Sequence, residues 1–87
     1  MQKLIAHRLY TEDRNRQAIL QILSKHVQGC TVYLTTGVWE GVAENSLCIE
    51  LVNTTFPVVS TIAQAIKEAN NQDAILYTAH EMKTRLF

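Results

Sequence analysis

Hydrophobic side chains recur with two different periods along this chain, and the order in which the periods change limits the folds it can adopt. Residues 46–52 alternate strictly, with leucine or isoleucine at every odd-numbered position, which is typical of a strand buried on one face. Residues 12–27 and 57–69 instead carry apolar side chains three and four positions apart. That spacing predicts two amphipathic helices, each with one buried stripe.

Three further segments are rich in β-branched and aromatic residues, which favour strands. They are residues 2–10, 30–36 and 73–79. The tail, residues 80–87, either extends the last of these strands or forms a short fifth strand. The predicted order is therefore strand, helix, strand, strand, helix, strand.

Residues at the predicted helix ends fit their positions. Thr11 is suited to cap the first helix, and the acids Glu12 and Asp13 would follow it in the first turn. Gly29 would end that helix with the positive φ that a C-terminal cap often needs. Pro57 is suited to the first turn of the second helix because it has no amide hydrogen to leave unpaired.

This order of elements resembles the ferredoxin-like, or split β-α-β, fold. The resemblance implies an α+β sandwich of βαββαβ topology, in which a four-stranded antiparallel sheet carries both helices on one face. We expect residues 1–87 to form one α+β domain of this kind. A resemblance at the level of the fold assigns no function.

The segment between the second and third predicted strands, residues 37–45, holds the only Trp of the chain and two of its three Gly. We expect a hairpin whose loop is longer than a two-residue turn. Trp39 would either cover the rim of the core or contact another molecule. Glu40 and Glu44 would either act as an acid–base or cation-binding pair or keep an exposed tip soluble. Because no His, Cys or basic residue accompanies them, we favour Trp39 as an anchor for another chain over a part of a catalytic site, and the alternative of a cover for the core stays open.

The sheet face opposite the helices has no cover within one chain of this fold. We expect it to combine small polar side chains with aromatic ones, which is the composition of an interface. The expected members are Thr31, Tyr33, Thr35, Ser46, Cys48, Glu50 and Tyr77. The predicted partner- or ligand-binding residues are accordingly Trp39, Glu40, Glu44, Tyr33 and Glu50.

Enzymatic chemistry has little support in the sequence. The best candidate is an acid–base pair of His7 and Glu50, on neighbouring strands of the open face. The chain has no serine elbow and no glycine-rich phosphate loop. We therefore predict no catalytic residues, no metal site and no cofactor.

Charge and composition limit the classes of partner that this chain can bind. Eight basic and eight acidic residues give zero net charge, and the basic ones are scattered, which argues against nucleic-acid binding. No segment is apolar enough to cross a bilayer, and no signal peptide precedes the first strand, so we expect a cytoplasmic protein without a membrane partner. The chain has only two cysteines, which are too few for a disulfide framework.

Three functions remain. The first is a non-enzymatic binding module that acts as a homo-oligomer, a dimer or higher, with a protein partner, as in an accessory protein of a phage or mobile element. The second is a sensor or sequestering protein for a nucleotide, amino acid or metal, with the ligand at a protomer interface. The third is a small enzyme that uses the open sheet face.

Overall fold

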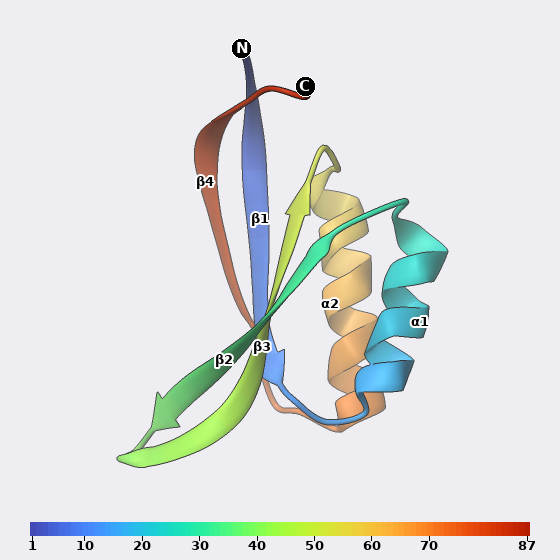
Figure 1. The fold of residues 1–87 in the computed structure, drawn as a ribbon. Helices are drawn as coiled ribbons and strands as arrows, with labels where there is room; N and C mark the ends of the chain where they lie inside the picture. The colour runs from blue at the N-terminus through green and yellow to red at the C-terminus, as the bar shows by residue number, and fades with distance from the viewer.

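The computed structural model describes all residues from 1 to 87 and contains six elements (Figure 1). The sheet is antiparallel, with strand order β2-β3-β1-β4, and both helices lie on one of its faces. The expected α+β fold of ferredoxin-like, βαββαβ topology is therefore confirmed. In chain order the elements are β1 (Gln2–Glu12), α1 (Arg16–His26), β2 (Thr31–Trp39), β3 (Val42–Val52), α2 (Phe56–Asn70) and β4 (Leu76–Thr84).

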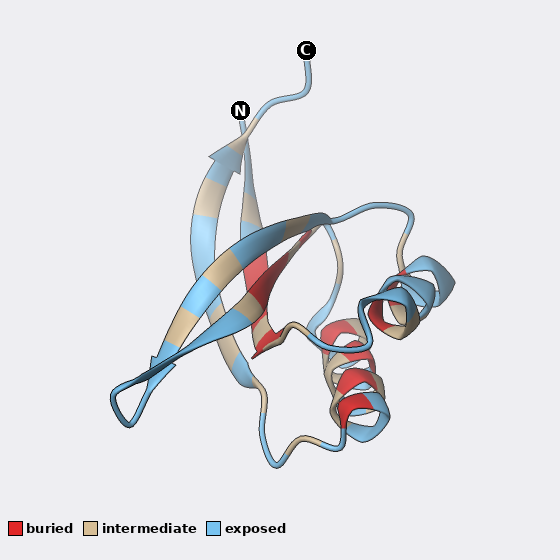
Figure 2. Cartoon of the chain, turned by 60° about the horizontal axis from the view of Figure 1, so that its bottom comes forward, coloured by how far each residue is buried: buried red, intermediate tan, exposed pale blue.

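The core lies between the two helices and the central strands β1 and β3. Leu9 pairs with Ile49 in the β1–β3 register, and both side chains are fully buried. Figure 2 shows the buried residues gathered where the helices face the sheet. The core cluster is Leu9, Ile19, Leu23, Leu47, Ile49, Leu51, Val59, Ile62 and Ile66. The helices have 11 and 15 residues, and neither is long and apolar enough to cross a membrane.

The first helix begins later than its sequence pattern predicts. Because β1 continues to Glu12, Thr11 is a buried strand residue and not a helix cap, and α1 starts at Arg16. Its cap position is taken by Asn15 in the left-handed region, with φ of 54°. Gly29 does not have a positive φ, so the predicted glycine cap is wrong.

The second helix and the last strand follow the sequence more closely. Thr55 precedes α2, and Pro57 lies in its first turn as predicted. Asn71, with φ of 51°, ends the helix in the left-handed conformation. β4 then continues through Thr84, so the tail extends the fourth strand and forms no fifth one.

The hairpin tip differs from the expected loop. β2 and β3 remain paired as far as Trp39 and Val42, and only two residues connect them. These residues, Glu40 and Gly41, have φ of 50° and 79°. Two consecutive positive φ angles are typical of the type I′ turn, whose twist matches that of the flanking strands. The prediction of a longer loop is therefore wrong.

The hairpin extends beyond the rest of the sheet. β1 pairs with β3 only as far as Ser46, which lies opposite Glu12. Beyond that point the two hairpin strands pair only with each other, and Figure 1 shows them projecting away from the helices. The tip is therefore presented on a two-stranded arm.

Candidate functional site

The strand register determines which side chains share the open face. Leu47, Ile49 and Leu51 point to the helices, so the residues that alternate with them on β3 face the opposite way. Their partners on β2 and β1 lie on the same open face. Six of the seven residues expected there are brought together: Thr31, Tyr33, Thr35, Ser46, Cys48 and Glu50.

Tyr77 is the exception. It lies opposite Leu9 on the side of the sheet that carries the helices. Its ring meets Phe56 edge-on, with 5.4 Å between the ring centroids. The expectation that Tyr77 lies on the open face is therefore wrong.

An ion pair occupies the middle of the open face. Arg8 lies opposite Glu50, and its Nε donates a hydrogen bond of 2.8 Å to the Oε2 atom of Glu50. The Glu50 side chain is only 13% exposed, against 35% for Arg8. The hydrogen bond to Glu50 raises the pKa of the Arg8 guanidinium, although burial opposes this effect. Arg8 was not among the predicted site residues, although a charged residue within an apolar strand was a signal for it.

His7 does not face Glu50, so the proposed acid–base pair is wrong. His7 lies opposite Leu51, on the helix side, and is 5% exposed. Its Nδ1 atom is 2.7 Å from the hydroxyl oxygen of Tyr77, and the two rings are stacked. Neighbouring strand residues point to opposite faces, so Arg8, and not His7, pairs with Glu50.

The hairpin arm exposes apolar side chains on both faces. Trp39 and Val42 lie on the open side and are 71% and 58% exposed. Trp39 therefore does not cover the rim of the core. Glu40 stands in the turn and Glu44 lies opposite Gly37. Both acids are exposed, and neither forms an ion pair within the chain.

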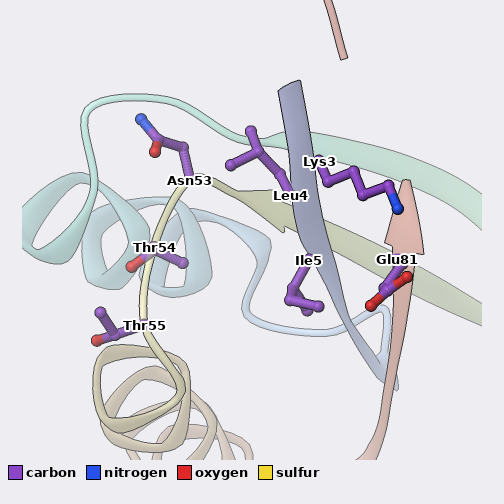
Figure 3. Close-up of a pocket in the computed structure, with 7 residues that line it drawn as sticks. All are labelled: Lys3, Leu4, Ile5, Asn53, Thr54, Thr55 and Glu81. Carbon is purple, nitrogen blue, oxygen red and sulfur yellow. The ribbon is translucent and has the colours of Figure 1, made fainter. Parts of the chain in front are cut away.

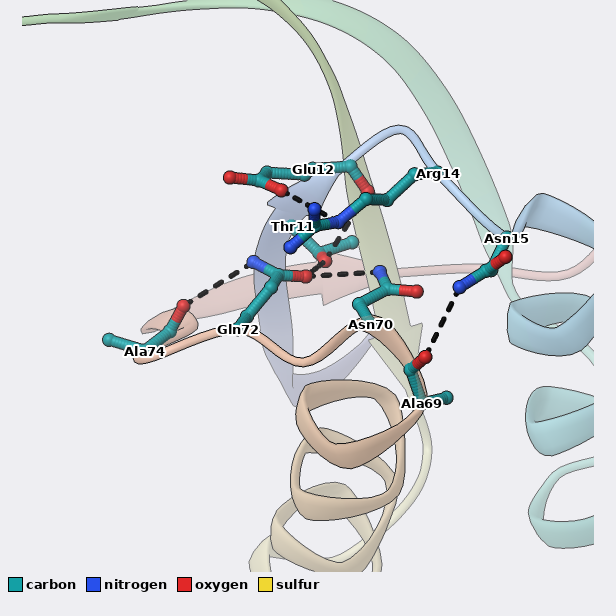
Figure 4. Close-up of polar contacts among 8 residues, drawn as sticks. All are labelled: Thr11, Glu12, Arg14, Asn15, Ala69, Asn70, Gln72 and Ala74. Atoms are coloured by element: carbon teal, nitrogen blue, oxygen red, sulfur yellow. Dashed lines mark hydrogen bonds and ion pairs between the residues drawn. The ribbon is translucent and has the colours of Figure 1, made fainter.

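The β1–α1 and α2–β4 connections lie at the same end of the molecule as the base of the hairpin. The amide of Asp13 donates to the carbonyl oxygen of Asn45, with 3.1 Å between the two atoms. This bond holds the β1–α1 connection beside the hairpin. The next residue, Arg14, is half exposed, and its Nε lies 2.8 Å from the Oε2 atom of Glu12 (Figure 4).

The α2–β4 connection reaches the same end of the molecule through Gln72. Its Oε1 atom accepts hydrogen bonds from the Thr11 hydroxyl and from the Asn70 amide (Figure 4). The Oδ1 atom of Asn70 is buried and has no hydrogen-bond partner. This polar cluster joins the end of β1 to the end of α2, and nothing in the sequence pattern linked residues so far apart.

A polar hollow lies at the other end of β1, beside the start of α2 (Figure 3). Its volume is about 370 Å³. The side chains of Lys3 and Glu81 extend on the β4 side, while Thr54 and Thr55 lie on the connection to α2. No ion pair joins Lys3 to Glu81. The lining residues are Lys3, Leu4, Ile5, Asn53, Thr54, Thr55 and Glu81.

No group of three or more His, Cys, Asp or Glu side chains is placed to hold a metal ion. The two cysteines are free. Cys30 is exposed, but partial desolvation of its thiol raises the pKa of that group. Cys48 is buried, although it lies on the open face. Trp39 on the arm, Tyr33 on β2 and the Arg14 cation at the base of the arm are the groups best suited to contact a ligand.

Comparison with known proteins gives a likeness in structure alone. No protein-family model matches the sequence, and no curated protein matches it. Among solved structures, CPII from Thiomonas intermedia K12, a nitrogen regulatory PII-like protein bound to ADP, AMP and bicarbonate, has a TM-score of 0.68 at 12% identity. The match covers 99% of this chain and 98% of that one.

Two other solved structures also match this chain over most of its length. A duf3240 family protein from Shewanella baltica OS155 gives a TM-score of 0.72 at 10% identity, covering 100% of this chain and 98% of that one. The GlnK–ATP complex of B. subtilis gives 0.64 at 18% identity, covering 92% and 82%. The chain has the fold of PII-like proteins. Identities this low show the fold and carry no function with it.

Proposed function

We propose that this chain is a small-molecule sensor or sequestering protein that acts as a homo-oligomer and holds its ligand between protomers, beside the β2–β3 hairpin. The observation that carries the proposal is the match along nearly the whole chain to CPII, whose structure contains ADP, AMP and bicarbonate. GlnK, which matches less completely, contains ATP. A nucleotide is therefore the first ligand class to test.

The geometry of the hairpin and its base supports this choice. Tyr33 and Trp39 lie on the open side of β2, and an exposed aromatic ring can stack on a nucleobase. Between them, Gly37 contributes no side chain. Arg14 lies beside the hairpin base, and a guanidinium is well suited to a phosphate.

The charge of the hairpin favours a site shared by protomers. β2 and β3 contain no Lys or Arg, so the arm by itself offers phosphates no positive charge. Arg14, or a basic residue of the neighbouring protomer, would supply it. In the proposal Glu40 and Glu44 contact the neighbouring protomer or the ligand, and Glu50 holds Arg8 on the face between protomers.

The comparisons favour this function over the accessory protein of a phage or mobile element, because the similar structures are PII-like proteins. The proposal includes a cytoplasmic location and no enzymatic activity. A protein partner is a second candidate, which rests on the exposure of Trp39 at 71%. An anchor of this kind is common at protein interfaces.

Thermal melting and Trp39 fluorescence test the proposal together. We expect ADP, AMP or ATP, with or without bicarbonate, to raise the melting temperature, since a ligand that binds only the folded form stabilises it. Fluorescence should change at the same time because Trp39 is the only Trp. Arg14→Gln should weaken the response, and Lys25→Gln, at an exposed position of α1, should not. If none of these ligands shifts either signal, the nucleotide proposal is wrong.

A further inference from the structure

The strands of the sheet do not end together beside the start of α2. β1 and β4 remain paired as far as Gln2 and Thr84, whereas the pairing of β1 with β3 stops at Ala6 (Figure 1). β3 ends at Val52, and the chain then turns toward α2 through Asn53, whose φ is 62°. The first residues of β1 therefore have no third strand beside them. The step between them and the β3–α2 connection forms the polar hollow of Figure 3.

Two opposite charges lie on one side of this hollow without pairing. Glu81 lies opposite Ile5 in the β1–β4 register, so the two side chains share one face of the sheet. Lys3 precedes Ile5 by two residues and lies on the same face. No ion pair within the chain includes Lys3 or Glu81. Lys83 lies directly opposite Lys3, and like charges in this position repel each other. An anionic group bound at Lys3 would relieve that repulsion.

Aliphatic surface lies between these charges and the connection to α2. Ile5 is 41% exposed, although β1 is an inner strand of the sheet. Figure 3 shows its side chain between Glu81 and Thr54, while the Leu4 side chain extends toward Asn53. The volume of the hollow, about 370 Å³, falls within the range of about 300–1,000 Å³ that is typical of ligand sites. The hollow thus combines one cation, one anion and exposed aliphatic surface.

We propose that this hollow is a second binding site, formed within one protomer, for a free α-amino acid with an aliphatic side chain. The carboxylate of the amino acid pairs with Lys3, its ammonium group pairs with Glu81, and its side chain covers Ile5. An anion without an ammonium group would meet the repelling carboxylate of Glu81. A cation without a carboxylate would meet the repelling ammonium groups of Lys3 and Lys83. A zwitterion matches both charges at once.

This site is separate from the one proposed for a nucleotide. The hollow lies at the start of β1, whereas Arg14 follows the end of that strand beside the hairpin base. The residues that line the hollow belong to β1, β4 and the β3–α2 connection. None of them belongs to the hairpin arm or to the polar cluster around Gln72. The inference therefore requires neither a bound nucleotide nor a second copy of the chain.

Amide chemical shifts measured by NMR during a titration with L-leucine test the inference. We expect saturable shifts at residues 3–5, residues 53–55 and Glu81, and much smaller shifts at the hairpin tip around Trp39. Isocaproate lacks the ammonium group of leucine and isoamylamine lacks its carboxylate, so each should bind at least about threefold more weakly. The inference is overturned if L-leucine causes no saturable shift at the hollow, if the tip shifts as much, or if either analogue binds as tightly as L-leucine.

Variants that remove one charge separate the two contacts. Lys3→Gln and Glu81→Gln should each raise the dissociation constant for L-leucine by at least about threefold, because each removes one ion pair with the ligand. Both side chains are exposed, so the variants should fold, and the same NMR spectra check this. Lys25→Gln and Glu68→Gln, at exposed positions of the two helices, are the matched controls and should bind as the native chain does. If folded Lys3→Gln and Glu81→Gln also bind L-leucine with native affinity, the inference is wrong.

The amino-acid and nucleotide measurements can fail separately. If nucleotides raise the melting temperature but L-leucine does not shift the amides of the hollow, only the inference about the hollow is wrong. If L-leucine binds at the hollow but no nucleotide changes the melting temperature or the Trp39 fluorescence, only the nucleotide proposal is wrong.

Discussion

At the scale of single residues, two glycines of this chain have different backbone conformations. Gly41 has φ of 79°, whereas Gly29 does not have a positive φ. A Cβ atom added at either position would meet no atom within 4 Å. Any difference between alanine substitutions at the two sites therefore reports backbone strain and not a steric clash.

Gly41→Ala should destabilise the protein by about 1–2 kcal/mol, because an L-residue in the left-handed region carries that strain. Gly29→Ala should be neutral or stabilise by up to about 1 kcal/mol, because it restricts the unfolded chain. Urea denaturation at one protein concentration measures both. Equal stabilities of the two variants would show that the tip does not hold the type I′ turn.

The ion pair before α1 should make stability depend on acid pH. Arg16 donates hydrogen bonds to Asp13, and these lower the pKa of the Asp13 carboxyl below its ordinary value of 3.8. A carboxyl with a lowered pKa in the folded state contributes stability that is complete above 3.8 and is lost as pH falls through the lower, folded value.

Asp13→Asn should therefore melt at a lower temperature than the native chain at neutral pH, and the two melting temperatures should converge as pH falls below the lowered pKa. The Arg16 side chain is 49% exposed and that of Asp13 is 17% exposed. Because solvent reaches the pair through Arg16, we expect a small difference that added salt reduces. Thermal melts from neutral pH to about pH 2 measure it. A gap that widens toward acid would contradict the assignment.

The limit of what can be predicted from the sequence is clearest at His7 and Arg8. Period and composition were enough to predict a strand at residues 2–10, but not which of these neighbours faces the helices. A shift of one residue moves a strand side chain to the other face, and the register that decides this comes from pairing with β3 and β4. The His7–Glu50 pair was wrong for that reason, and the Arg8–Glu50 pair was missed.

At the scale of elements, the same limit applies to the hairpin. The alternation in residues 46–52 predicted β3, but the strand begins four residues earlier, at Val42. Glu-Gly is not one of the pairs that usually mark a type I′ turn, which are Asn-Gly and Asp-Gly. The two glycines therefore indicated a loop, and the projecting arm was not foreseen. The helices were easier to predict, because each buries an apolar stripe against the core and the spacing of that stripe can be recognised in the sequence.

The start of α2 lacks the charge that its helix dipole favours. The first turn has no acidic residue, and the Thr55 side chain forms no capping hydrogen bond. Thr55→Asp should stabilise the protein by about 0.5–1 kcal/mol, through a cap and a charge near the helix N-terminus. Thr61→Asp, at an exposed position within α2, is the matched control and should not stabilise. Urea denaturation compares the two, and equal effects would contradict a role for the helix end.

At the scale of the whole molecule, the structure is more elongated than a compact domain with the same number of residues. The radius of gyration is 13.3 Å and the principal extents are 40 × 28 × 21 Å, whereas a compact domain of this length has a radius of about 12 Å. Figure 1 shows the cause, which is the arm formed by β2 and β3. An exposed apolar arm is difficult to explain in an isolated chain and is readily explained in an assembly.

Assembly through the uncharged side chains of β2 should be insensitive to salt. Contacts between exposed charges weaken as salt shortens the screening length from about 30 Å at 0.01 M to about 3 Å at 1 M. β2 contributes backbone hydrogen bonds and apolar side chains and no charge, and the chain has zero net charge, so screening removes neither attraction nor repulsion. Light scattering from low to high salt should therefore give dissociation constants that agree within about threefold. A steep rise of the dissociation constant with salt would assign the contact to charged residues, such as Arg14 and Glu12, and would contradict assembly through β2.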